Sequence, residues 1–96
     1  MDKINYSNWG KPISKNQRGV PFKDLFHLFI SGTPIKRKCW RGYWKYSPFE
    51  NDVEMHLKDG TMKYMSNTDN LAFTLAAFTA DDWEVATNEN CDIEVK

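Results

Sequence analysis

The amino-acid sequence predicts an α+β fold in which one N-terminal amphipathic helix packs on a small antiparallel sheet of about five strands. Five apolar residues recur at spacings of three and four, the pattern of a helix with one apolar face: Phe22, Leu25, Phe26, Phe29 and Ile30. After residue 34, short segments alternate β-compatible and charged residues and are separated by turn signals. The strongest of these signals is Asp59-Gly60, which is typical of a two-residue hairpin.

The elements are expected in a simple order. Pro21 suits the start of the helix and Gly32 its end. Strands are predicted over residues 35–40, 43–49, 53–58 and 61–66, with the Asp59-Gly60 turn between the last two. Residues 71–78 are ambiguous, because alternation favours a strand while 70–77 also fits two helical turns. The prediction is a short strand followed by a helical turn over 76–81, and residues 83–86 form the closing strand.

The chain length of 96 residues fits one domain with a modest core. Residues 1–20 are expected to form an irregular N-terminal arm, which Trp9 and Ile13 could anchor. The α+β domain spans residues 21–87, and residues 88–96 form a polar acidic tail. Aromatic residues make up 15% of the chain, so some rings are expected to face a ligand or a second subunit. No segment resembles a membrane span or a signal peptide, so a cytoplasmic location is expected.

Charge divides the chain into two halves. Residues 1–46 hold ten Lys or Arg against two Asp, a balance of +8, whereas residues 47–96 hold three Lys against eleven Asp or Glu, a balance of −8. The halves are expected to attract each other, within the fold or between identical subunits. A second interpretation is that one basic segment provides a positive field for an anionic ligand, through Lys36, Arg37, Lys38, Arg41 and Lys45. Both can hold.

The sequence favours binding over catalysis. Neither histidine lies in a motif that pairs it with a nucleophile, the glycines are isolated, and Cys39 and Cys91 lack metal-ligand spacing. We therefore expect no enzyme, cofactor or metal. Aromatic and basic residues instead interleave over 37–46, and this mixture suits a nucleotide, since rings stack on the base and Arg pairs with phosphate. Single-stranded nucleic acid is less favoured, because the acidic half repels a long phosphate chain.

Four pieces of the sequence occur in a recognisable order. They are the helix from Phe22 to Gly32, the basic strand from Ile35 to Trp40 with its Arg37-x-x-Trp40 pattern, the Asp59-Gly60 hairpin, and the closing segment from Asp81 to Val85. With this order over residues 21–87, the chain resembles the Thoeris anti-defence two-like domain family of phage proteins. It departs from many relatives in having only residues 47–52 where they carry a longer insertion.

The resemblance implies a function as well as a fold. Members of this family are sponges that sequester a cyclised ADP-ribose signal without cleaving it, in pockets at the subunit interfaces of a homotetramer, and some hold cyclic oligonucleotide signals. The chain is therefore expected to be a homotetramer, a dimer of dimers, in the cytoplasm of an infected bacterial host. The alternatives are a phage domain that binds and inhibits a host protein, and a single-stranded nucleic-acid binder.

The family motifs point to Arg37, Trp40 and the segment from Asp82 to Glu84, and the aromatic stretch adds two further rings. The expected ligand-binding residues are Arg37, Trp40, Tyr43, Trp44, Asp82 and Trp83. In this set Arg37 is the expected phosphate contact. Trp40 and Trp83 are either core or pocket residues, and Asp82 could instead cap the turn before the closing strand.

Overall fold

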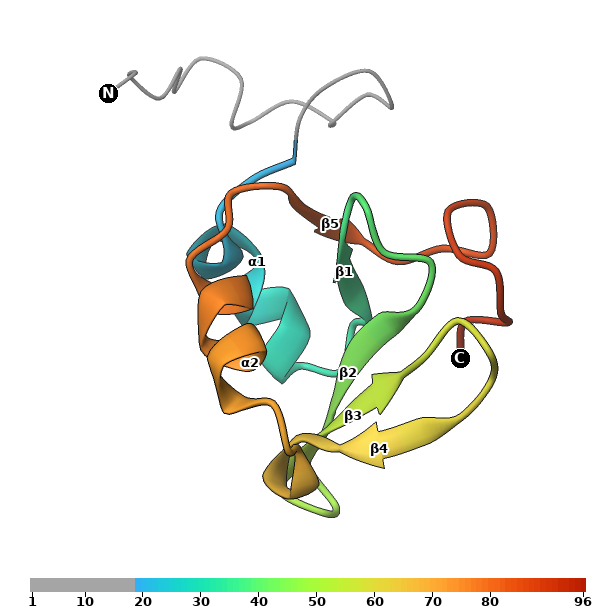
Figure 1. Cartoon of the computed structure of the whole chain (residues 1–96). Coiled ribbons are helices and arrows are strands. Elements are labelled where there is room, and N and C mark those ends of the chain that lie inside the picture. Colours follow the sequence, from blue (N-terminus) through green and yellow to red (C-terminus); the bar gives the residue numbers. More distant parts are fainter. Residues whose placement is uncertain (1–18) are drawn as a thin grey trace.

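The computed structural model describes residues 19–96. Most of the expected N-terminal arm, including Trp9 and Ile13, lies outside the described residues. The α+β prediction is confirmed: two helices lie on one side of a five-stranded antiparallel sheet (Figure 1). No helix in the described part of the chain is long and apolar enough to cross a membrane.

The sheet brings together strands that are far apart in the sequence. The elements in chain order are α1 (Phe22–Ile30), β1 (Ile35–Arg37), β2 (Tyr43–Ser47), β3 (Asp52–His56), β4 (Met62–Tyr64), a 3-10 turn (Met65–Asn67), α2 (Leu71–Phe78) and β5 (Trp83–Val85). The spatial order of the strands is β4-β3-β2-β1-β5, and all neighbours are antiparallel. The closing strand therefore pairs with the first strand and not with its predecessor.

The two strongest local predictions are confirmed. Helix α1 buries Leu25 and Phe29 and is followed by Gly32, whose φ of 105° only glycine adopts without strain. The hairpin between β3 and β4 turns at Gly60, with a φ of 93°. Asp59 stabilises this turn, because its Oδ1 accepts hydrogen bonds from the backbone N–H and the hydroxyl of Thr61, at 3.0 and 2.7 Å.

The prediction of a short strand within residues 71–78 is wrong, because the whole segment is the helix α2. Asn70 caps it by accepting a hydrogen bond from the backbone N–H of Phe73 at 3.1 Å. Apolar residues lie on every side of α2, so strand-like alternation and helical periodicity fit the sequence equally well. Tertiary contact favours the helix: the indole N–H of Trp83 donates to the carbonyl of Ala77 at 3.0 Å.

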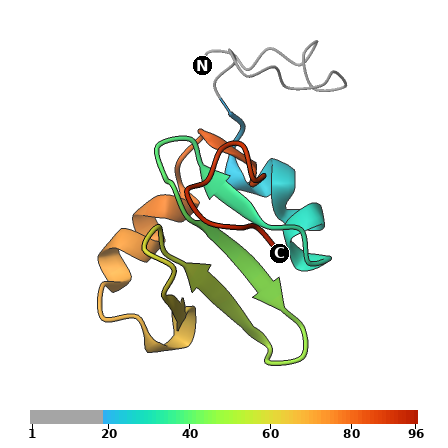
Figure 2. The ribbon, with the colours of Figure 1, turned by 90° about the vertical axis from the view of Figure 1, so that its right-hand side faces the viewer.

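Alternation along the strands gives the sheet two different faces. The face under the helices holds the main apolar core, which includes Ile35, Trp44 and Trp83. Residues 86–96 cross the opposite face (Figure 2), where Tyr43 packs with Cys91 in a second, smaller cluster. The acidic tail expected at residues 88–96 is therefore packed against the sheet.

Ion pairs connect the basic half of the chain to the acidic half. Within residues 19–96, all four salt bridges of Lys or Arg do so: Lys36–Glu84 at 2.6 Å, Arg37–Asp82 at 2.8 Å, Lys38–Glu84 at 3.2 Å and Arg41–Asp92 at 2.9 Å. Three of them join β1, or Lys38 just after it, to β5 or to Asp82 just before β5. The division of charge thus acts within the fold, in agreement with the first of its two interpretations.

Candidate ligand-binding groove

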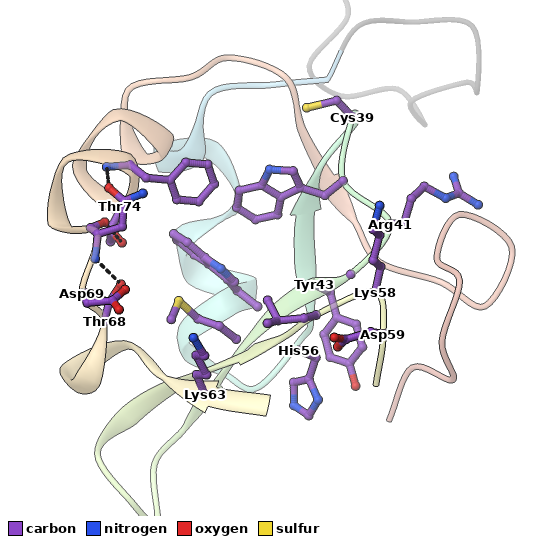
Figure 3. A pocket seen from close by; sticks show the side chains of 17 residues that line it. Cys39, Arg41, Tyr43, His56, Lys58, Asp59, Lys63, Thr68, Asp69 and Thr74 are labelled. Carbon is purple, nitrogen blue, oxygen red and sulfur yellow. Dashed lines mark hydrogen bonds between the residues drawn. The ribbon is translucent and has the colours of Figure 1, made fainter. Parts of the chain in front are cut away.

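A groove of about 570 Å³ lies between the N-terminal part of α2 and the strands β2 to β4, and it is open to solvent. Its volume is in the range of sites that hold small molecules. The groove is lined by residues from three segments: 39–44, 55–59 with Lys63, and 68–70 with Phe73 and Thr74 (Figure 3).

The floor of the groove is a row of side chains that crosses the sheet. Trp44 of β2 lies opposite Met55 of β3, and Met55 lies opposite Lys63 of β4. Directly opposite residues share a face of the sheet, so these three line the groove together. The row begins with a buried indole at the core and ends with an exposed ammonium group at the edge strand.

Aromatic rings form one end of the groove. Trp40 stacks on Phe73 with ring centroids 6.0 Å apart and an angle of 28° between the planes. Trp40 also contacts Trp44 and Trp83, at centroid distances of 5.1 and 5.2 Å. It is partly buried against the core and lines the groove at the same time, so the two interpretations of Trp40 are compatible.

Charged side chains form the rim. Arg41, Lys58 and Asp59 lie on one side of the groove, and Asp69 lies on the other (Figure 3). Arg41 is already paired with a carboxylate, and the Asp59 carboxylate is bound within its own turn. Lys58 and Lys63 are exposed and form no salt bridge with any residue in the range 19–96. They are therefore the cations available to an anionic ligand.

Three of the six expected site residues line this groove: Trp40, Tyr43 and Trp44. Tyr43 is buried at its edge and stacks on His56, with ring centroids 4.5 Å apart and planes 13° from parallel. The His56 Nε2 lies 2.9 Å from a carboxylate oxygen of Glu54. The Tyr43 ring thus packs with Cys91 on the face of the sheet opposite the helices, and it is not offered to a ligand on the helix side.

The other three residues lie elsewhere. Arg37 is bound to Asp82 through two hydrogen bonds of 2.8 and 3.3 Å, which raise the pKa of the guanidinium and occupy it. The cause is the sheet register, which sets Arg37 opposite Trp83 and so beside Asp82. Arg37 therefore lies outside the groove with part of its guanidinium engaged by Asp82, and its expected contact with phosphate stays a prediction. Trp83 has no exposed surface and belongs to the core, which was one of its two interpretations.

Among the groove residues that the sequence-based interpretation missed are Lys58, Lys63, Asp69 and Phe73. Each lies outside the basic and aromatic stretch on which the prediction was built. The overlooked signal is Asn70 three residues before Phe73, which fits a helix N-cap and would have placed Asp69 and Phe73 at the same helix end. The lysines carried no local signal, because only the β3–β4 hairpin brings them to the groove.

The two cysteines differ in environment. Cys39 is exposed and lines the groove, whereas Cys91 is buried on the other face of the sheet, and burial raises the pKa of its thiol. Within residues 19–96, no group of three His, Cys, Asp or Glu side chains is arranged to hold a metal ion.

Comparisons with protein-family models, with curated proteins and with solved structures found no match to this chain. The resemblance to the Thoeris anti-defence two-like domain family accordingly depends on the ordered sequence motifs alone.

Proposed function

We propose that this protein is a phage anti-defence sponge that binds a cyclic nucleotide immune signal in the groove and sequesters it without cleavage. The ligand is a cyclic ADP-ribose isomer or a cyclic oligonucleotide. One observation carries the proposal: the groove combines the exposed ring of Phe73 and the partly buried ring of Trp40 with two lysines, Lys58 and Lys63, that have no salt-bridge partner in the described chain. Rings stack on a base, and ammonium groups attract its phosphates.

Sequestration also requires slow release, which an open groove on one chain does not provide. A second copy placed over the groove would close it. Apolar surface suited to such a contact adjoins the groove on α2, where Leu71 and Leu75 are 61% and 55% exposed. We therefore propose a homo-oligomer, a tetramer built as a dimer of dimers, as the functional form. Light scattering at micromolar concentration should give the mass of an assembly, and a monomer would contradict this part of the proposal.

Ligand binding is tested directly by thermal denaturation with cyclic ADP-ribose isomers and with cyclic di- and trinucleotides. At a ligand concentration of one hundred times the Kd, stability rises by about 2.7 kcal/mol, which raises the Tm of a small domain by roughly 10 °C or more. Bound ligand should be recovered intact after the protein is denatured. The absence of any shift refutes the proposed function, and recovery of a linearised product refutes sequestration without cleavage.

Two matched variants locate the site. Phe73→Ala removes a ring that is 48% exposed in the groove, and Phe49→Ala removes a ring that is 94% exposed outside it. Stacking contributes roughly 1 to 3 kcal/mol per base. Calorimetry should therefore find weaker binding by Phe73→Ala only, with both variants folded. Equal affinities of the two variants would exclude the groove as the binding site.

The exposed thiol gives an independent measure of occupancy. Cys39 lines the groove and should react readily with a thiol reagent, whereas buried Cys91 should react only on unfolding. A ligand in the groove should slow the modification of Cys39 in proportion to its occupancy, as followed by mass spectrometry. Unchanged reactivity at a saturating ligand concentration would place the ligand elsewhere.

A second candidate function is supported by the apolar surface of α2, namely a small phage domain that binds and inhibits a host protein. Surfaces of this kind mark protein contacts. A monomer that binds no nucleotide in the assays above would favour this alternative. Single-stranded nucleic acid remains a third candidate, and it predicts affinity that increases with oligonucleotide length and falls steeply with salt.

A further inference from the structure

The N-terminal end of α2 presents a set of polar groups to the groove beside the exposed ring of Phe73. Thr68, Asp69, Asn70 and Thr74 all line the groove with Phe73. Asp69 and Asn70 lie in the turn that leads into α2, and both line the same groove as Phe73 in its first turn. A planar base stacked on Phe73 would therefore have one edge within reach of Asp69 and Asn70.

Thr68, Asp69, Asn70 and Thr74 form a polar wall of the groove, and part of its hydrogen-bonding capacity is already used within the protein. The Asn70 Oδ1 accepts from the backbone N–H of Phe73, which leaves the two Nδ2 hydrogens as donors. Asp69 is exposed and forms no hydrogen bond or salt bridge with any residue from 19 to 96, so both carboxylate oxygens are available as acceptors. The wall thus offers a pair of acceptors next to a donor.

We infer that the groove selects guanine, with Asp69 as the residue that determines specificity. This inference rests on the proposed nucleotide-binding function and, of its two ligand classes, selects guanine-containing cyclic oligonucleotides over cyclic ADP-ribose isomers, whose base is adenine. The guanine edge carries two adjacent donors, N1–H and the N2 amino group, which a carboxylate accepts together, and its O6 can accept from the Asn70 amide. Adenine has a lone pair at N1, which a carboxylate repels. The Lys58 and Lys63 ammonium groups contact the phosphates of the same ligand.

Three mononucleotides test the inference, because they share ribose and phosphate and differ only at the base edge. GMP carries both donors, IMP lacks the N2 amino group, and AMP lacks the N1 hydrogen. Binding is measured by titration of each into the isotope-labelled protein, following the indole N–H resonances by NMR. We expect affinity to decrease from GMP to IMP to AMP, with a total difference of roughly five- to tenfold, the low end of the range for a bidentate pair because this wall is open to water.

The variant Asp69→Asn removes the carboxylate and should bring the affinities for GMP and AMP within about twofold of each other, since an amide offers only one acceptor. The matched control is Asp81→Asn, which makes the same change in net charge at an exposed residue outside the groove. It should keep the preference for GMP. Both variants should unfold at nearly the parental temperature.

The outcomes separate this inference from the function on which it rests. Equal binding of GMP and AMP by the parent protein, or an unchanged preference in Asp69→Asn, overturns the guanine assignment and leaves nucleotide binding intact. A failure of all three nucleotides to perturb the protein at millimolar concentration overturns both. A loss of preference in Asp81→Asn as well would show that net charge, and not Asp69, sets it.

Discussion

Replacing Trp83 with alanine should be among the most damaging single changes in this domain. The indole has no exposed surface and contacts Phe22, Trp40 and Trp44 at centroid distances of 5.2, 5.2 and 5.3 Å. Truncating such a side chain costs about 3 to 5 kcal/mol. The hydrogen bond from the indole N–H to the Ala77 carbonyl adds little to this cost, because that carbonyl also accepts from the backbone N–H of residue 80 at 3.2 Å.

The stability lost in Trp83→Ala is a large part of the total free energy of unfolding. A domain of this length is stable by roughly 5 to 14 kcal/mol, so Trp83→Ala removes about a fifth or more of that free energy. Urea unfolding followed by circular dichroism measures the change without depending on tryptophan fluorescence. The midpoint should fall by more than about 1 M urea. Trp83→Phe retains most of the ring volume, so its urea midpoint should lie between those of the parent and of Trp83→Ala.

A small midpoint shift would refute this reasoning. If Trp83→Ala unfolded within about 0.5 M urea of the parent and lost ligand affinity instead, Trp83 would be a pocket residue reached by movement of the chain. The central position of Trp83 in the apolar cluster would then have no energetic consequence, and the groove would have to extend beneath Trp40.

Three further changes test other parts of the fold. Arg37→Ala should cost no more than about 1 kcal/mol of stability, because Arg37 and Asp82 are 27% and 28% exposed. Calorimetry should find its nucleotide affinity unchanged, and a large loss of affinity would show that Arg37 belongs to the binding site. Gly42→Ala should destabilise the protein by about 1 to 3 kcal/mol in urea, since the new Cβ would lie 2.1 Å from the backbone oxygen of His56; an unchanged midpoint would exclude this close approach. Burial raises the pKa of Glu84, but hydrogen bonds and charge from two lysines lower it by a larger amount. The pKa of Glu84 therefore lies below its ordinary value of 4.5. A lowered folded-state pKa gives stability that is present above that value and lost as pH falls below it; the Tm of the parent should therefore drop more between pH 5 and pH 3 than that of Glu84→Gln, and parallel curves would contradict this.

The sequence predicted those elements whose signals are local. The spacing of apolar residues in α1 and the turn at Asp59-Gly60 depend only on neighbours in the chain, and both are where they were expected. Residues 71–78 lacked a distinguishing signal, because apolar side chains on every side satisfy a helix and a strand alike. Their conformation depends on the contact between α2 and Trp83, which no local pattern reveals.

The candidate site was predicted only in part, for the same reason. Trp40, Tyr43 and Trp44 lie in the interleaved aromatic stretch, and all three line the groove. The position of Arg37 depends on its pairing with a strand forty-six residues later, so its commitment to Asp82 could not be seen in the sequence. A basic residue beside an aromatic one indicates a binding site only when no carboxylate from a distant part of the chain pairs with that basic residue.

The pairing of β1 with β5 has a consequence for how the protein folds. β1 lies between β2 and β5, and the Tyr43 hydroxyl accepts a hydrogen bond from the backbone N–H of Lys96, fifty-three positions away. Contacts over such separations require closure of most of the chain before they are formed, which slows folding. Until β5 and residues 91–96 are in place, β1 has an unpaired edge and Tyr43 lacks its cover. We therefore expect β1 and the face of the sheet that carries Tyr43 to be completed late and in one cooperative step, and the chain to expose apolar surface until then.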